Sequence, residues 1–507
     1  MILFKITFLD KIFAKRQIVF AKILINFNQD NKTLRVAVLS SEAVPFSKTG
    51  GLADVAGALP KFLKQQGADA SLITPLYQQT KHETVGNLAI EDLNIDWRGS
   101  NYRCSVYFSD AGGAPSFLIH APEMFFRSSI YGFREDYLRY AFFSKAALAL
   151  IKRLGNPPDI IHLNDWHTGF AAVEIADKRR WDPFFKNIRT VFSIHNLAYQ
   201  GMFGAEELWK LGFGEEWQQN AFLQNNAANA MKAGLAASDW LSTVSRGYAR
   251  ETQTSEQGNG LDWLLRERSD RYIGILNGVD YEEWNPAKDK NIAANFDLND
   301  LAGKRKCKQD LLSTFGLLQD LERPLFGWVS RLTPQKGVSL LQAVAFEMVM
   351  SGAYFVALGS GSEEYENFLQ ALRDFAPRQV GVYRGYSEPL AHKIEAGADM
   401  FLMPSQFEPC GLNQMYSLRY GTVPIVRATG GLDDTVEEFD RVSETGNGFK
   451  FKNYDSGAFL EKIYEAMFCY AEPETWRKIQ LNGMRIDNSW EKAARNYLQL
   501  YRIASEQ

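Results

Sequence analysis

Short apolar runs that end in small or polar residues recur along the chain and alternate with amphipathic stretches. The run at 34–42 predicts a buried strand, the stretch at 52–67 the helix that follows it, and the run at 70–77 the next strand. A strand–helix–strand opening is typical of a parallel sheet, so the pattern predicts an α/β fold. Further strands of this sheet are expected at 158–165, 190–196 and 239–245.

From about residue 271 the rhythm of short strands and helical spans starts afresh. Apolar runs predict the strands of a second parallel sheet at 272–278, 325–330, 354–361, 379–385, 399–405 and 422–428. The polar stretch at 276–304 is typical of a surface connection, so we place the domain boundary near residues 272–275. The last segment has helical spacing behind a capping serine, Ser489, and predicts a terminal helix docked on an apolar face.

The expected organisation therefore has four parts: an N-terminal extension at 1–34, one α/β domain at 35–273, a second at 274–488, and the terminal helix at 489–507. The extension is basic and apolar, and none of its hydrophobic runs is long enough to span a bilayer. A targeting peptide, an addition from an upstream start codon and a disordered tail stay open as alternatives.

Composition narrows the class of protein. The 507 residues are 46% hydrophobic and 23% charged, which is enough for two or more ordinary globular domains. The net charge of -4, without a long basic tract, favours neither nucleic acid nor a membrane as a partner. Four scattered cysteines argue against a disulfide framework and a thiolate zinc site. His162 and His167 would need further metal ligands, so we expect no catalytic metal and no cofactor.

Two cations, Arg331 and Lys336, follow the predicted strand at 325–330. Open α/β sheets bind ligands just outside the carboxyl ends of their strands, so a guanidinium and an ammonium there favour a phosphate-bearing ligand. Glu408 follows a later strand, before a turn and a helix start. Singly, each of these charges would usually be a solvated surface group. In combination they predict a binding site.

A glycine pair, Gly50 and Gly51, stands between the first predicted strand and the first predicted helix. Paired glycines let the backbone approach a ligand, and a helix N-terminus supplies unpaired N–H donors. Lys48 adds a full positive charge. The segment is neither GxGxxG nor a P-loop, so it supports neither a nicotinamide-dependent dehydrogenase nor an NTPase.

Ordered motifs give the chain a resemblance to a known family: KTGGLADV, HLNDWHTG, SIHNLAYQG, LNGVD, SRLTPQKG and FEPCGLNQMYSLRYGTVPIVRATGGLDDTV. Together they resemble the bacterial and plant glycogen and starch synthases, which transfer glucose from ADP-glucose to an α-1,4-glucan. The resemblance runs from about residue 35 to the C-terminus. It implies the GT-B fold, in which two Rossmann-like domains face a cleft, and a terminal helix that returns to the first domain. It also implies retention of configuration and a cytoplasmic location, or a plastid one if 1–34 is a transit peptide.

The resemblance assigns roles to five residues of the first domain. Lys48 would bind the ADP-glucose donor, Asp54 would bind substrate, and Gly51 would let the backbone approach the donor phosphates. Asp165 and His195 would face the transferred glucose, the histidine largely through its backbone carbonyl. Two structural alternatives stay open. Asp165 could cap the helix that follows it, and His195 could be a hydrogen-bonded core histidine.

In the second domain the resemblance assigns Arg331 and Lys336 to the diphosphate leaving group. Glu408, with the backbone at Cys410 and Gly411, would hold glucose hydroxyls. As a structural matter, Cys410 is expected to be a small buried residue rather than a nucleophile, because no histidine lies nearby in the sequence to activate it.

Two further residues would contact substrate by the same resemblance. Asn277 would bind a sugar hydroxyl, although an Asn beside Gly278 is also what a tight turn needs. Tyr386 would stack on the adenine, although it could equally be ordinary packing.

Two departures from the family pattern, and several alternative functions, concern the identity of the donor. Many retaining enzymes of this fold have a second glutamate where this chain has Tyr416, and its absence favours ADP-glucose over UDP-glucose. Asn413 stands where threonine is more usual. Without an Asp-x-Asp metal motif, the protein's own cations must meet the leaving group. The rivals are a related transferase with UDP-glucose or another acceptor, and an inactive glucan-binding protein. A glucan phosphorylase is disfavoured, and the oligomeric state is not determined.

Overall fold

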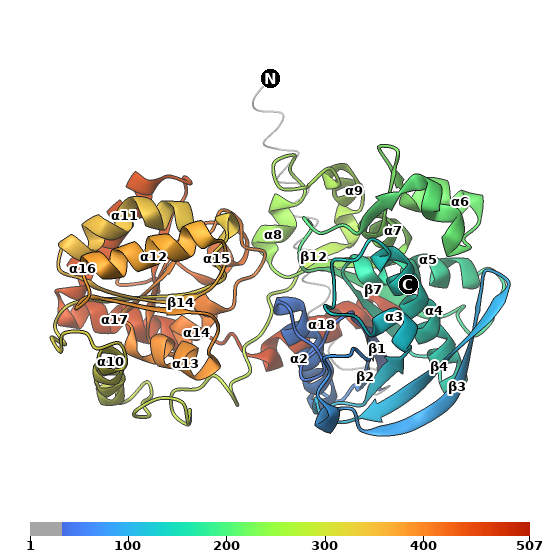
Figure 1. Cartoon of the computed structure of the whole chain (residues 1–507), viewed down its shortest axis with the longest axis horizontal. Coiled ribbons are helices and arrows are strands. Elements are labelled where there is room, and N and C mark those ends of the chain that lie inside the picture. Colours follow the sequence, from blue (N-terminus) through green and yellow to red (C-terminus); the bar gives the residue numbers. More distant parts are fainter. Residues whose placement is uncertain (1–32, 507) are drawn as a thin grey trace.

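The computed structural model describes residues 33–506, which form two lobes, each with a central sheet flanked by helices (Figure 1). The predicted α/β class is confirmed. The expectation for the first 34 residues lies, apart from residues 33 and 34, outside the described residues. In the described part of the chain, no helix is both long and apolar enough to cross a membrane.

Within residues 33–506, the first lobe holds a nine-stranded sheet in the order β12-β11-β7-β6-β1-β2-β5-β4-β3. From β12 to β5 all neighbours are parallel, whereas β4 and β3 run antiparallel at one edge. The strands are β1 (Arg35–Leu39), β2 (Asp69–Pro75), β3 (Asn87–Trp97), β4 (Ser100–Ser109), β5 (Ser116–His120), β6 (Ile160–Asn164), β7 (Arg189–Ile194), β11 (Trp240–Thr243) and β12 (Tyr272–Gly274). The predicted parallel sheet is therefore present, but the prediction omitted the two antiparallel strands β4 and β3 at its edge.

Helices cover this sheet, and a small antiparallel sheet lies beside it. The helices are α2 (Gly51–Gln65), α3 (Pro122–Phe125), α4 (Asp136–Leu154), α5 (Gly169–Lys178), α6 (Glu215–Trp217), α7 (Ala230–Ala237), α8 (Arg246–Glu251) and α9 (Asp262–Glu267). The small sheet has the order β8-β10-β9, formed by β8 (Met202–Gly204), β9 (Leu223–Gln224) and β10 (Ala227–Asn229).

The prediction that the run at 272–278 opens the second sheet is wrong. β12 pairs in parallel with β11, with Leu241 opposite Tyr272, and forms an edge of the first sheet. Because α8 and α9 connect β11 to β12, the chain makes one more crossover before it leaves the first lobe. An apolar run predicts a strand but does not tell which sheet will accept it. The domain division at residue 273 stays a prediction.

In the same described residues, the second lobe holds a six-stranded parallel sheet in the order β15-β14-β13-β16-β17-β18. Its strands are β13 (Leu325–Val329), β14 (Tyr354–Gly359), β15 (Val380–Arg384), β16 (Met400–Met403), β17 (Val423–Arg427) and β18 (Phe449–Phe451). Its helices are α10 (Ala302–Thr314), α11 (Val338–Met350), α12 (Glu363–Phe375), α13 (Glu388–Gly397), α14 (Asn413–Arg419), α15 (Gly430–Thr435), α16 (Ser456–Tyr470) and α17 (Pro473–Met484).

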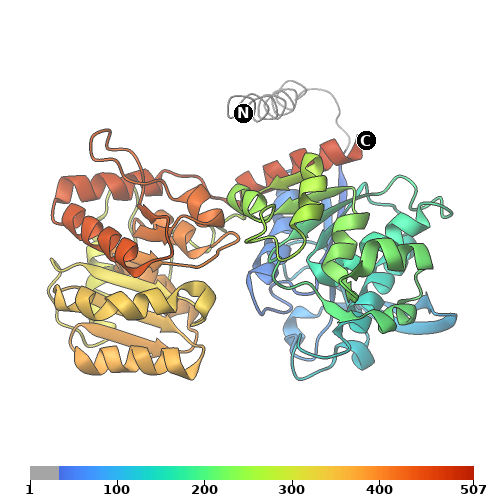
Figure 2. The same cartoon turned by 90° about the horizontal axis from the view of Figure 1, so that it is seen from above.

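The terminal helix α18 (Trp490–Ser505) lies along the first lobe (Figure 2). The hydroxyl of Ser489 accepts a hydrogen bond from the Lys492 N–H, which confirms the predicted capping serine. The apolar face of α18 shares a core with α2 and β1, and the Tyr501 hydroxyl lies 2.7 Å from His162 Nδ1. The terminal helix therefore packs on the lobe that contains β1 and α2.

Candidate active site between the lobes

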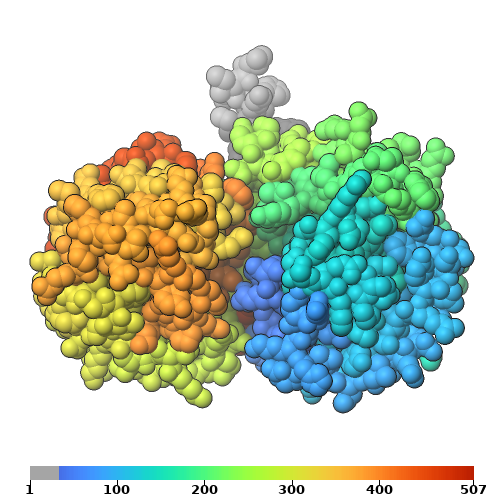
Figure 3. All heavy atoms as spheres, in the orientation of Figure 1, coloured from blue at the N-terminus to red at the C-terminus, as the bar shows by residue number. Residues whose placement is uncertain are grey.

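The loops that follow strands of the two sheets meet at a groove between the lobes, which the space-filling view shows (Figure 3). Hydrogen bonds cross this boundary: Ser245 Oγ donates to the Pro409 carbonyl at 2.5 Å, and the Gly247 N–H donates to Asp434 at 2.7 Å. Glu251 at the end of α8 accepts from the Gly430 N–H at 2.8 Å. The groove is therefore bounded on one side by hydrogen bonds that hold the lobes together.

Asp165 ends β6 and turns toward the neighbouring strand. Its φ of 56° is uncommon outside glycine, and its carboxylate accepts the backbone N–H of His195 at 2.7 Å. The side chain makes no hydrogen bond to the helix that follows, so the capping alternative is wrong. Burial raises the pKa of Asp165 to about 7, against the lowering effect of the N–H donors of His195 and Asn196.

The imidazole of His195 is hydrogen-bonded to a neighbouring side chain. Its Nε2 lies 2.9 Å from Asn164 Oδ1, and burial lowers the pKa of His195 to about 4. The ring is therefore neutral at neutral pH and already hydrogen-bonded inside the protein. This geometry agrees with the alternative of a hydrogen-bonded core histidine, and the contact of the His195 carbonyl with the glucose stays a prediction.

Glu42 is a buried acid that the sequence reasoning missed. It follows β1, is only 3% exposed, and its Oε2 accepts the Thr49 N–H and hydroxyl at 2.5 and 2.8 Å. Burial raises the pKa of Glu42 to about 7. Glu42 also raises the pKa of Asp165 by its charge, so the two carboxyls lie on one wall. The sequence signal that could have identified Glu42 is its position: an acid just after a buried strand, two residues beyond Ser40.

The loop before α2 is open to the groove. Lys48 Nζ contacts Asp54 Oδ1 at 2.7 Å. Burial opposes the charge on Lys48, but Asp54 and, from the second lobe, Tyr386 and Glu388 outweigh it, and the pKa of Lys48 is raised. A Cβ added at Gly50 or Gly51 would meet nothing within 4 Å. Packing inside the protein therefore does not require these glycines.

In the second lobe, Lys336 and Glu408 are brought together although 72 residues separate them. Lys336 Nζ lies 2.6 Å from Glu408 Oε2, which also accepts from Ser405 at 3.2 Å. Arg331 is exposed, and among residues 33–506 its guanidinium has no hydrogen-bond or ion-pair partner. One cation is thus paired with the buried acid, and the other is available.

Two further predicted contact residues are Asn277 and Tyr386. Asn277 is 7% exposed, and its Oδ1 is buried with no hydrogen-bond partner in the described part of the chain. The neighbouring Gly278 is required by packing, because a Cβ there would lie 2.4 Å from the Trp490 Cα. Tyr386 is 68% exposed, so the packing alternative is wrong for this ring.

Cys410 is buried, and burial raises the pKa of its thiol to about 12, as expected for a residue that is not a nucleophile. Gly411 has a φ of 74°, and a Cβ there would lie 2.4 Å from Gln414 Oε1, so the turn itself requires glycine. Asn413 Nδ2 donates to the Val329 carbonyl at 2.6 Å, which ties the start of α14 to the end of β13.

Tyr416 occupies the position of the missing second glutamate. Its ring is stacked 3.9 Å from Trp284 with an interplanar angle of 4°, inside the second lobe. An ionised carboxylate would be costly in such an aromatic stack. Of the predicted residues, the first lobe carries Asp165, His195, Lys48 and Asp54, and the second lobe carries Arg331, Lys336, Glu408 and Tyr386. Lys48 and Asp54 lie close enough to Tyr386 to affect its pKa.

Family models match both lobes. The starch synthase catalytic domain matches residues 35–267, and the glycosyl transferases group 1 model matches residues 313–480. Similar proteins include glycogen synthase 1 of Geobacter metallireducens, with 43% identity over 93% of this chain and 96% of the relative. Glycogen synthase of Koribacter versatilis is also 43% identical, over 93% of this chain and 99% of the relative.

Solved structures agree. The catalytic domain of starch synthase IV from Arabidopsis thaliana, bound to ADP and acarbose, superposes with a TM-score of 0.86 at 34% identity, covering 94% of this chain and all of that chain. Sucrose-phosphate synthase from Thermosynechococcus elongatus, with a TM-score of 0.58 at 18% identity, shares the fold. The predicted two-domain GT-B fold is thereby confirmed.

Proposed function

Because the chain belongs to the family of glycogen and starch synthases, which are glycosyltransferases, we propose that it transfers glucose from ADP-glucose to the non-reducing end of an α-1,4-glucan with retention of configuration. The observation that carries the proposal is the pair of cations at the groove: Arg331, which has no partner among the described residues, and Lys336, which is paired with the buried Glu408. A nucleotide diphosphate is the ligand that such a pair fits best.

The leaving group takes up negative charge as the bond from glucose C1 to the β-phosphate breaks. Arg331 can offer a bidentate fork and Lys336 a point charge to the phosphate oxygens. One charge pair at about 4 Å contributes roughly 4 kcal/mol at an effective dielectric near 20. Fixed cations need no reorganisation at the moment of reaction, so they stabilise the transition state more than solvent would.

The sugar would lie between the two walls. Glu408, with the backbone at Cys410 and Gly411, would hold its hydroxyls, because the second oxygen of a carboxylate can accept while the first stays on Lys336. Asn277 Oδ1, buried and unpaired, supports a hydroxyl partner from the same ligand. Asp165 and the carbonyl of His195 would face the glucose from the other wall.

The donor nucleotide would extend from the phosphates toward Tyr386. An exposed aromatic ring at a groove is suited to stacking on a base. Lys48 and Asp54 lie close enough to Tyr386 to affect its pKa, which supports a donor site that both lobes complete. Gly51 would let the α2 N-terminus approach the phosphates, where unpaired N–H groups favour an anion.

Retention would follow a front-face route. Glu42 and Asp165 are held by backbone N–H donors, and Glu408 by Lys336, so none of the three acids is set up as a free nucleophile. The departing phosphate would deprotonate the acceptor hydroxyl on the same face. Closure of the lobes would exclude water and protect the sugar from hydrolysis.

The test is a donor competition on the purified protein. Radiolabelled ADP-glucose and UDP-glucose are offered in turn with glycogen, and label in the polymer and free nucleotide are measured. We expect ADP-glucose to be strongly preferred and ADP release to equal glucose incorporation. Preference for UDP-glucose would replace the proposed donor, and no transfer from either would indicate a glucan-binding protein without activity.

A further inference from the structure

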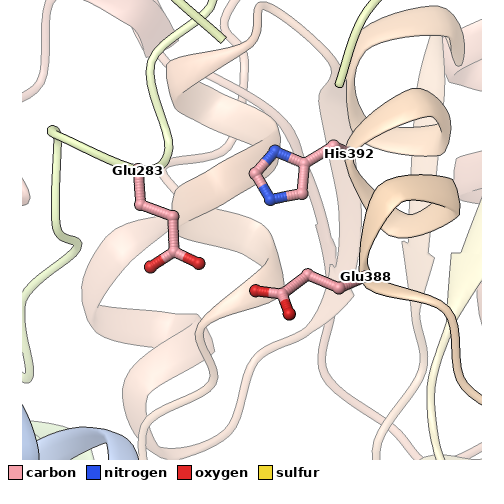
Figure 4. Close-up of side chains that lie close together, drawn as sticks. All are labelled: Glu283, Glu388 and His392. Carbon is pink, nitrogen blue, oxygen red and sulfur yellow. The ribbon is translucent and has the colours of Figure 1, made fainter. Parts of the chain in front are cut away.

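A second polar cluster lies near the groove, where α13 begins two residues after Tyr386. It consists of Glu283, in the segment that leaves the first lobe, and Glu388 and His392, which are four residues apart on α13. One ligand atom from each side chain lies within 4.8 Å of the others. Figure 4 shows the two carboxylates facing each other with the imidazole beside them.

The orientation of His392 is fixed from behind. Its side chain is 1% exposed, and Nδ1 lies 2.7 Å from Asp289 Oδ2, which also accepts from the Tyr420 hydroxyl at 2.6 Å. The Trp284 ring stacks on the imidazole at 3.7 Å and fixes its plane. Because Nδ1–H donates to Asp289, the other nitrogen carries the lone pair.

That second nitrogen has no partner in the part of the chain that the structure describes. His392 Nε2 is buried and makes no hydrogen bond to any described residue. In Figure 4 it is the ring nitrogen on the side of Glu283 and Glu388. A buried polar atom without a partner is rare, and a carboxylate on the other ring nitrogen is the usual support of a metal-binding histidine.

The two carboxylates are the other candidate ligands. Glu283 and Glu388 are exposed at the groove, so an ion can enter. The two carboxyl groups face each other beside the imidazole, at a place where a cation would fit between them (Figure 4).

We propose that Glu283, Glu388 and His392 bind one divalent transition-metal ion of the Zn²⁺ class. One imidazole nitrogen and two carboxylate oxygens suit Zn²⁺, whereas Mg²⁺ and Ca²⁺ prefer all-oxygen sites. The ion ties the segment around Glu283 to the first turn of α13, two residues after Tyr386. It acts on the stability of the second lobe and takes no part in the departure of the diphosphate, so this inference does not rest on the proposed function.

Calorimetric titration of the full-length, chelator-treated protein with Zn²⁺ tests the site. We expect about one tightly bound ion and a rise in melting temperature of a few degrees at saturating Zn²⁺, with no comparable effect of Mg²⁺. Glu283→Gln and Glu388→Gln should each weaken Zn²⁺ binding by about tenfold or more. The matched control is Glu282→Gln, which changes the neighbouring exposed glutamate, paired with Lys288 at 2.6 Å.

His392→Asn probes the third ligand but also disturbs a buried stack, so Glu283→Gln carries the decision. Equal Zn²⁺ affinity in the Glu283→Gln and Glu282→Gln variants, or no binding to the unchanged protein, would overturn the site. X-ray absorption at the zinc edge should show only nitrogen and oxygen ligands, at about 2.0–2.1 Å. Glucose transfer measured on the same samples should be unchanged in Glu283→Gln, which separates this inference from the proposed reaction.

Discussion

The two walls of the groove hold their polar groups in different ways. In the first lobe, Glu42 and Asp165 are buried acids that accept backbone N–H groups, and burial raises the pKa of each to about 7. In the second lobe, Arg331 is exposed and without a partner among the described residues, and Lys336 is paired with Glu408.

This difference suggests that the two walls bind different parts of the substrate. A wall of acids fixed by the backbone changes little when a ligand arrives, and it suits the weakly charged sugar. A wall with an available guanidinium and an ammonium shared with one acid suits a diphosphate, whose charge grows during the reaction. If the division is right, substitutions on the two walls should differ in size and in pH dependence.

The largest effect is expected on the cationic wall. Arg331→Ala and Lys336→Ala should each lower kcat for glucose transfer by about 10²-fold or more, because each removes a charge that meets the leaving group. Steady-state release of ADP measures this. Arg373→Ala, which removes an exposed cation of α12 outside the groove, is the control. Wild-type turnover in either groove variant would refute its assigned role.

The acidic wall should appear in the pH dependence. Both acids are neutral below their raised pKa values and ionised above them, and an ionised Asp165 stabilises positive charge on the sugar. We therefore expect kcat/KM to fall about tenfold for each pH unit below about 7, the limit for loss of one ionised group. The kcat/KM profile from pH 5 to 8 measures it.

Two variants identify the carboxyl group that causes this fall of kcat/KM at low pH, which is called the acid limb of the profile. Asp165→Asn should remove the limb and lower the plateau, whereas Glu42→Gln should move the limb to lower pH, because Glu42 contributes to the raised pKa of Asp165. A profile that stays flat from pH 5 to 8 in the unchanged protein would contradict the role of this wall.

A smaller effect is expected at the loop before α2. Gly51→Ala should lower kcat/KM by about tenfold with little change in melting temperature, because the added Cβ meets the donor rather than the protein. Gly214→Ala is the matched control, since a Cβ there also meets nothing within 4 Å. Equal kcat/KM in the two variants would show that the backbone at Gly51 does not approach the phosphates.

The smallest effect on activity is expected far from the groove. Tyr501→Phe removes the partner of His162 Nδ1 and should lower the free energy of unfolding by about 1–3 kcal/mol, as for a buried group left unpaired. Glucose transfer by the folded protein should stay near the unchanged value. Chemical denaturation measures the first quantity. A large loss of kcat without a loss of stability would mean that α18 shapes the acidic wall directly.

Much of the fold could be predicted from local pattern. Buried parallel strands such as β1 and β13 are continuous apolar runs, so the sequence indicates them directly. The hairpin of β3 and β4 was missed, although Leu93, Ile95 and Trp97 alternate with exposed residues as a half-buried strand requires. The sheet that accepts β12 depends on the path of α8 and α9, which local pattern does not contain.

The site was predictable where charge and motif coincide, and less so where it depends on distant partners. Lys336 and Glu408 could be placed together because both follow parallel strands. The unpaired Oδ1 of Asn277 and the contact between Glu283 and α13 arise only from the packing of segments about 100 residues apart. The spacing of Glu388 and His392 on one helix face was a usable signal, but it named no third ligand.

The central claim is that protein cations, not a metal, meet the departing nucleotide. The most direct measurement is kcat for ADP release from ADP-glucose and glycogen after exhaustive treatment with EDTA. We expect kcat to stay within about twofold of the untreated value, because Arg331 and Lys336 supply the positive charge. Abolition of glucose incorporation by EDTA, with recovery on addition of Mg²⁺ or Mn²⁺, would contradict the claim.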